Sequence, residues 1–182
     1  MRKQVEYKVL QSKELYSGRL RGVREIIENP DGKTFTHETI QHPGAVVVLP
    51  LDDGGDILCV SQYRHSIREV LLEFPAGTLE QGEEPAVCAQ RELREEIGYG
   101  ARELISLGTI YPAPGFCSEL QHLFFARGLF EASAQCDEDE DITVVRIGID
   151  EFELAVREGS MQDAKSIALY MRARIEGYLS FS

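Results

Sequence analysis

The sequence lacks any long hydrophobic run. Its longest uniformly apolar stretch extends only from Ala45 to Leu49, whereas a helix that spans a membrane needs about 20 apolar residues. Arg2 and Lys3 near the N-terminus are not followed by an apolar segment, so no signal peptide is expected. We therefore expect a cytoplasmic protein with no membrane partner.

Cysteine and histidine are scarce, and their spacing excludes the usual zinc patterns. The four cysteines are Cys59, Cys88, Cys117 and Cys136. They contain no CxxC pair, and His37 and His42 are five residues apart, which is not the i, i+4 spacing of a helical zinc pair. We expect free thiols in a reducing compartment and no zinc site.

Positive charge is also in short supply. The chain has 19 Lys and Arg against 31 Asp and Glu, which gives a formal net charge of −12. A surface that binds nucleic acid needs clustered basic residues, so no nucleic-acid partner is expected. An anionic small substrate is still compatible with this charge, because divalent cations can lie between its phosphates and acidic side chains.

The first forty or so residues predict a small antiparallel β unit. Strands are expected at 5–9, 19–27 and 34–40, with a turn at 16–18 and a stronger turn signal at 29–32. A sheet of this size is not stable alone, so we expect residues 1–42 to pack on something else.

The remaining residues, 43–182, have the content of an α/β domain. The expected strands are 45–51, 57–63, 70–74, 104–110, 120–126 and 142–149. The period becomes helical from Pro85 to Ile97, where the apolar stripe consists of Ala86, Ala89, Leu93 and Ile97. Two closing helices are expected at 149–158 and 163–178.

The first of these helices carries an unusual density of carboxylates. Glu92, Glu95 and Glu96 lie within about one turn, and we expect them to lie opposite the apolar stripe or to flank it. Arg91 and Arg94 offset part of their mutual repulsion. A charge run is most often a solvated face, but carboxylates at this spacing also suit Mg²⁺, which prefers oxygen ligands.

The loop before the helix decides between these two interpretations. Residues 77–99 read G-x5-E-x7-R-E-L-x-E-E-x-G-Y, which begins at Gly77 and includes Glu83. This segment resembles the Nudix box, and only Tyr99 is bulkier than the usual aliphatic residue at the last position. The resemblance implies a Nudix α/β/α sandwich with a mixed sheet, preceded here by the small β unit. It also implies a hydrolase that cleaves pyrophosphate bonds with Mg²⁺, or alternatively with Mn²⁺.

The same resemblance assigns roles within and beside the box. The expected metal ligands are the Ala76 carbonyl, Glu92, Glu95 and Glu96, with Glu96 central to catalysis. Arg91 would orient these glutamates through charge-assisted hydrogen bonds. Gly77 would let the loop approach the metal, and Glu83 would be an accessory group in the same loop.

The flanking segments resemble the branch of the family that hydrolyses ADP-ribose and other nucleoside diphosphate sugars. The three matching segments are 72–77, 111–119 and 37–45. In this branch the N-terminal unit crosses to a partner subunit, which implies a homodimer with residues 1–42 as its dimerisation unit and residues 43–182 as its catalytic domain. The implied reaction converts ADP-ribose to AMP and ribose 5-phosphate. GDP-mannose or a broader set of nucleotide sugars is the alternative, and a non-catalytic binding module is disfavoured because the box keeps its glutamates.

The branch also implies residues outside the box. Glu138 would act as the base and Glu140 as a further metal ligand, although their two roles are interchangeable by sequence. Arg64 would bind a phosphate, since a guanidinium suits bidentate phosphate recognition, and Glu119 would bind a ribose hydroxyl.

Stacking on the base of the substrate needs an aromatic side chain. The candidates are Tyr16, Phe35 and Phe116. Phe35 and Phe116 are equally well explained as core residues.

Overall fold

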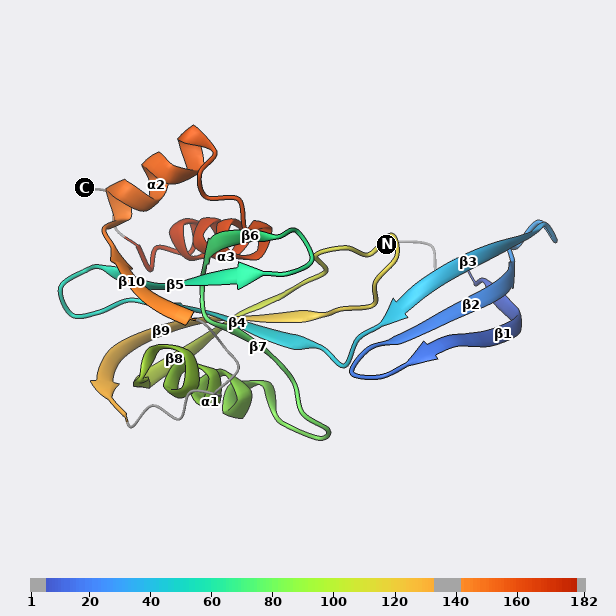
Figure 1. Cartoon of the computed structure of the whole chain (residues 1–182), viewed down its shortest axis with the longest axis horizontal. Helices are drawn as coiled ribbons and strands as arrows, with labels where there is room; N and C mark the ends of the chain where they lie inside the picture. Colours follow the sequence, from blue (N-terminus) through green and yellow to red (C-terminus); the bar gives the residue numbers. More distant parts are fainter. Residues whose placement is uncertain (1–5, 133–141, 180–182) are drawn as a thin grey trace.

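The computed structural model describes residues 6–132 and 142–179, and it has a layered body from which a separate sheet extends (Figure 1). In the body, strands lie between helix α1 (Pro85–Ile97) on one side and helices α2 (Ile149–Glu158) and α3 (Ala164–Ile175) on the other. This is the α/β/α sandwich that the sequence predicts. No helix in the described ranges is long and apolar enough to cross a membrane.

The strand layer is mixed. One sheet has the order β7-β4-β9-β8 and consists of β4 (Ala45–Pro50), β7 (Ala76–Thr78), β8 (Tyr99–Ile110) and β9 (Gln121–Glu131). Strands β4 and β9 are parallel, whereas the other pairs are antiparallel. The second sheet has the order β10-β5-β6 and consists of β5 (Ile57–Arg64), β6 (Glu69–Glu73) and β10 (Ile142–Ile147).

Strand β4 divides the hydrophobic core in two. Val46 and Val48 belong to the cluster that contains Leu93 of α1, whereas Val47 and Leu49 belong to the cluster of α2 and α3. Successive side chains of a strand point to opposite faces, and all six residues of β4 are buried. Such a continuous apolar run is typical of a strand that is covered on both faces.

Helix α1 begins and ends where the sequence predicts, because its boundaries are encoded locally. Pro85 occupies the first turn, and Gly98 ends the helix with φ 73°, donating its N–H to the Leu93 and Arg94 carbonyls. One member of the predicted stripe is wrong: Ala86 is exposed, and Cys88 is buried instead. Ala86 lies in the first turn of α1, which begins at Pro85, and there it faces solvent.

The carboxylates of α1 flank this apolar stripe. Glu92 is 8% exposed and Glu96 is 7% exposed, so they are not a solvated charged face. Their burial favours the functional interpretation of the charge run, since carboxylates are almost never buried without partners.

The N-terminal sheet has the order β1-β2-β3 and extends away from the body, on the right of Figure 1. Its strands are β1 (Lys8–Ser17), β2 (Arg21–Glu28) and β3 (Thr34–Gln41). The predicted turn at 16–18 is wrong by its first two residues, because β1 continues through Ser17. Strand β1 is exposed on both faces, so its apolar and polar residues need not alternate, and the sequence does not show where the strand ends.

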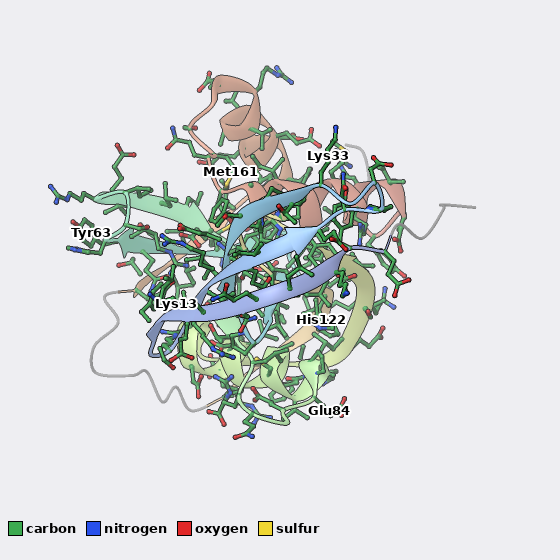
Figure 2. The ribbon with its side chains drawn as sticks, turned by 90° about the vertical axis from the view of Figure 1, so that its right-hand side faces the viewer. Lys13, Lys33, Tyr63, Glu84, His122 and Met161 are labelled. Atoms are coloured by element: carbon green, nitrogen blue, oxygen red, sulfur yellow. The ribbon has the colours of Figure 1, made fainter. Side chains whose placement is uncertain are left out.

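A few backbone contacts join this sheet to the body. The Ile40 N–H donates to the Phe116 carbonyl at 2.7 Å, and the Ser118 N–H donates to the Ile40 carbonyl at 2.9 Å. Figure 2 shows the sheet in front of the body, with Lys13 and Lys33 on it. Within a single chain, all residues of β1 remain exposed, so the packing expected for residues 1–42 is incomplete there.

The largest differences from the predicted strands of the body concern β7, β8 and β9. Strand β8 begins at Tyr99, directly after α1, and β9 continues to Glu131, because these two strands pair along nearly their whole length. Ala76 and Gly77, which follow the expected strand 70–74, form the short strand β7 against β4. Pairing between segments distant in sequence sets these boundaries, and local propensity does not record it.

Candidate active site

A cleft of about 680 Å³ lies at the end of the strand layer, where β4, β5, β7 and β9 meet the second half of α1 and the start of α3. It brings together most of the residues that the sequence predicts for the site. Those that line it are Arg64, Ala76, Gly77, Arg91, Glu92, Glu95, Glu96 and Glu119. The cleft thus unites the helix, the preceding loop and two distant segments.

Arg91 is the centre of an ion-pair network within the Nudix-like segment. Its Nε and Nη2 donate to the two oxygens of Glu83, each at 3.0 Å. Its Nη1 donates to Glu92 at 2.6 Å and to Glu95 at 2.8 Å. One guanidinium therefore fixes three carboxylates, which is the geometry that the predicted orienting role requires.

This network shifts the pKa values of its members in opposite directions. The hydrogen bonds from Arg91 lower the pKa of Glu83 to about 2. The hydrogen bonds to Glu83, together with the negative charges around it, raise the pKa of Arg91 above its already high ordinary value. Both groups therefore stay charged at neutral pH, and the network stays intact.

Gly77 is required by a close approach between the loop and the helix. A Cβ atom at this position would lie 1.7 Å from Glu92 Oε1 and 1.9 Å from its Cδ. Next to it, the Ala76 N–H donates to Glu96 Oε2 at 3.0 Å. The backbone of β7 and two carboxylates of α1 are thus in direct contact, and any side chain at Gly77 would separate them.

The donor set of the cleft suits a hard divalent cation. Carboxylate oxygens of α1 and backbone carbonyls of β7 are the ligand types that Mg²⁺ prefers. Within residues 6–132 and 142–179, no group of three or more His, Cys, Asp or Glu is gathered closely enough to hold a metal by itself. A hydrated cation fits this arrangement, since Mg²⁺ keeps several waters and takes one or two carboxylates together with substrate phosphates.

Arg64 lies on another wall of the cleft, where it is held by a buried carboxylate. Its Nε and Nη2 donate to the two oxygens of Glu73, each at 2.6 Å. Glu73 also accepts a hydrogen bond from Lys165, and Lys165 donates to Asp163 at 3.0 Å. Burial would raise the pKa of Glu73, but the hydrogen bonds from Arg64 and Lys165 outweigh it and lower this pKa below its ordinary value.

Glu119 lies at the β9 end of the cleft. The side chain of Gln121 donates to Glu119 Oε1 at 3.0 Å and so orients this carboxylate. Gln121 and Gln62 also line the cleft, and the side-chain oxygen of each is buried without a hydrogen-bond partner in the described part of the chain.

The predicted stacking residues do not line the cleft of a single chain. Tyr16, Phe35 and Phe116 are 47%, 43% and 60% exposed, so the alternative that Phe35 and Phe116 are core residues is wrong. Phe35 makes an edge-to-face contact with Tyr7 at a centroid distance of 6.1 Å. Stacking by Tyr16 or Phe116 stays a prediction. The other predicted pair, Glu138 and Glu140, lies outside the described residues.

Several lining residues escaped the sequence analysis. They are Arg19, Gln62, Gln121, Asp163 and Lys165. Asp163 carries a sequence signal as the residue before a helix, and it does cap α3 by accepting from the Ser166 N–H at 3.0 Å. The pairing of Lys165 with Glu73 has no such signal, because 92 residues separate them.

The class of protein is defined by this arrangement. A carboxylate-rich helix contacts a short strand at Gly77, and both belong to an α/β/α sandwich. The NUDIX domain model matches residues 41–170, and the chain belongs to this family. It is accordingly an enzyme, a hydrolase acting on pyrophosphate bonds, as the sequence predicts.

Similarity to individual proteins extends beyond the family domain. The chain is 38% identical over 167 residues to an ADP-ribose pyrophosphatase of Bacillus subtilis, covering 90% of each chain. It is 36% identical over 170 residues to a methanol dehydrogenase activator of Bacillus methanolicus, covering 92% of each. The crystal structure of an ADP compounds hydrolase has a TM-score of 0.85 at 22% identity over 96% of each chain, which confirms the predicted fold.

Proposed function

We propose that this Nudix hydrolase cleaves the pyrophosphate bond of ADP-ribose to yield AMP and ribose 5-phosphate. The observation that carries the proposal is the 38% identity with the ADP-ribose pyrophosphatase of Bacillus subtilis over 90% of both chains. This match is longer than the segment 41–170 of the family model, so it includes parts of the chain that flank the Nudix domain. GDP-mannose, or a broader range of nucleoside diphosphate sugars, is the alternative substrate class.

The carboxylate end of the cleft would hold the divalent cation. We assign the ligands to the Ala76 carbonyl, Glu92, Glu95 and Glu96, with Mg²⁺ as the cation and Mn²⁺ as a substitute. When bound, the cation neutralises the diphosphate charge and activates water for attack. Arg91 keeps the glutamates in place, supported by its 2.6 Å and 2.8 Å bonds to Glu92 and Glu95.

The substrate would be bound by residues on the other walls. Arg64 would donate to a phosphate oxygen, and Glu119 would accept a hydrogen bond from a sugar hydroxyl. We assign removal of the proton from the attacking water to Glu138 and an additional cation contact to Glu140, both in the segment that the structure does not describe. Tyr16 and Phe116 are the candidates for stacking on the base.

We further propose a homodimer in which residues 1–42 form the dimerisation unit and residues 43–182 the catalytic domain. All ten residues of β1 are exposed in one chain, among them the apolar Val9, Leu10 and Leu15. Among residues 6–132 and 142–179, β1 is an edge strand of its sheet, and an edge with exposed apolar side chains favours a covering partner. Light scattering at micromolar concentration should give the mass of a dimer, and the mass of a monomer would refute this part.

The three described cysteines, Cys59, Cys88 and Cys117, are free thiols. Free thiols support the proposal that the protein works in the reducing cytoplasm.

A substrate panel tests the proposed reaction. The full-length protein is assayed with Mg²⁺ or Mn²⁺ against ADP-ribose, GDP-mannose and UDP-glucose, and the products are separated by chromatography. We expect the highest kcat/KM with ADP-ribose. Turnover of a dinucleoside polyphosphate in preference to all three sugars would refute the substrate class, and tight binding without turnover would indicate a non-catalytic module.

A further inference from the structure

We propose that Lys165 is a substrate-binding residue that acts together with Arg64 on a phosphate group, and that the buried Glu73 positions both cations. This inference rests on the proposed function, because it assigns a phosphate subsite within the same cleft. It adds a residue from α3, far in sequence from the Nudix box, to the residues that contact the substrate.

Glu73 is a buried carboxylate at the back of this wall. Its side chain is 1% exposed, and a buried carboxylate is strongly unfavourable unless it is paired and hydrogen-bonded. Arg64 alone already supplies a full positive charge and two parallel hydrogen bonds at 2.6 Å. Arg64 therefore neutralises Glu73 by itself, and Lys165 adds a positive charge beyond what this carboxylate requires.

Asp163, the other partner of Lys165, does not cancel this excess completely. Its Oδ2 atom caps α3 by accepting from the N–H and the hydroxyl of Ser166. The positive end of the α3 dipole partly balances the charge of an acidic residue at this place. The wall formed by β5, β6 and α3 thus keeps a positive character on the side where Arg64 and Lys165 line the cleft.

Both cations have donors left for a ligand. An ammonium has three N–H groups, and in the described part of the chain Glu73 and Asp163 accept from two of them. A guanidinium has five, and Glu73 accepts from Nε and Nη2 of Arg64. The remaining donors suit the oxygens of a phosphate, which accept several hydrogen bonds at once.

The charge pattern of the cleft orients a diphosphate. Glu92, Glu95 and Glu96 repel phosphate oxygens unless a cation lies between them. Arg64 and Lys165 attract these oxygens directly, and the pair is held rigidly because one carboxylate, Glu73, anchors both. A phosphate of the substrate is therefore drawn to this wall while the reacting bond faces the carboxylates.

Substitution of Lys165 tests the proposal by separating KM from kcat. In Lys165→Met we expect the KM for ADP-ribose to rise about ten- to hundred-fold, as for loss of a hydrogen bond from a charged group, with kcat changed less than about three-fold. Lys165→Arg should retain most of the affinity. Arg127→Met is the matched control, because Arg127 is a half-exposed cation that pairs with Glu103 and does not line the cleft, so both constants should stay unchanged.

Glu73→Gln tests the positioning role, and it should raise the KM in the same direction as Lys165→Met. Product inhibition identifies the phosphate concerned: inhibition by AMP or by ribose 5-phosphate should weaken in Lys165→Met. A KM within two-fold of wild type, or unchanged inhibition by both products, would overturn the proposal. A lower melting temperature with unchanged KM would make Lys165 structural and would overturn it as well.

A binding measurement separates failure of the phosphate subsite from failure of the proposed function. If the wild-type protein turns over no nucleotide sugar, the proposed function fails. Calorimetric binding of inorganic pyrophosphate with Mg²⁺ then still compares the wild type with Lys165→Met. Weaker binding by the variant supports the phosphate subsite, and equal binding refutes it.

Discussion

Gly77→Ala is the most direct perturbation of the contact between the loop and the carboxylate helix. The added Cβ would lie 1.7 Å from Glu92 Oε1 and 2.5 Å from Glu92 Oε2, so either the carboxylate or β7 must move. A shift of Glu92 breaks its 2.6 Å bond to Arg91, and a shift of β7 disturbs the 3.0 Å bond from the Ala76 N–H to Glu96.

The expected size of this effect follows from the displacement. A misplacement of about 1 Å in a catalytic arrangement costs about 100-fold in rate. We therefore expect kcat to fall at least 100-fold, and the free energy of unfolding to fall by about 1–3 kcal/mol because of overpacking. Steady-state kinetics and urea denaturation measure the two effects.

Gly148→Ala is the matched control. Gly148 has φ −69°, and the nearest atom to its added Cβ is Asp56 Oδ1 at 3.8 Å, an ordinary contact. Its kcat should equal that of the wild type. A Gly77→Ala variant that keeps its kcat within about two-fold would refute the reasoning that the loop must touch Glu92.

Three further predictions concern the carboxylates and the core. Glu96→Gln should lower kcat by orders of magnitude with an unchanged circular dichroism spectrum, since it removes a ligand charge and keeps the shape; an unchanged kcat would contradict the metal-site assignment. The hydrogen bond from Tyr170, and those from Arg174, lower the pKa of Glu153. The ionised Glu153 therefore stabilises the folded protein above the ordinary pKa of about 4.5, and this stabilisation is lost as the pH falls through the lowered pKa of the folded state. Glu153→Gln should therefore reduce the loss of melting temperature on acidification, and an identical loss would contradict this. Phe152→Ala should cost about 3–5 kcal/mol in urea denaturation, because Phe152 is fully buried and stacks on Phe74 and Tyr170 at 5.3 Å and 4.4 Å; a cost below about 1 kcal/mol would mean that the core closes around the cavity.

The elements with local signals are those that the sequence predicts best. Pro85 and Gly98 predict the observed start and end of α1, because a proline at the start and a glycine just after the end act within one turn. The uniformly apolar β4 is likewise found, since burial on both faces leaves a clear pattern. The extent of β1 is missed because this strand is exposed on both faces.

The candidate site divides in the same way. The resemblance to the Nudix box implies that Gly77, Glu83 and Arg91 belong to one site. In the structure Arg91 joins Glu83 to Glu92, and Gly77 closely approaches Glu92. The wall of Glu73 and Lys165 was not predicted, because the contact between β6 and α3 arises only when α3 packs on the strands. An ion pair between residues that are 92 positions apart produces no periodic pattern in a single sequence.

We assign to this chain the hydrolysis of a pyrophosphate bond. The most direct test follows labelled oxygen from water into the products. ADP-ribose is incubated with the enzyme and Mg²⁺ in water enriched in heavy oxygen, and the products are analysed by mass spectrometry. We expect AMP and ribose 5-phosphate, with the label in the phosphate of one of them and no products when the divalent cation is chelated. Label on a ribose carbon together with release of adenine would contradict it, as would recovery of every nucleotide sugar intact when ADP-ribose, GDP-mannose and UDP-glucose are each supplied.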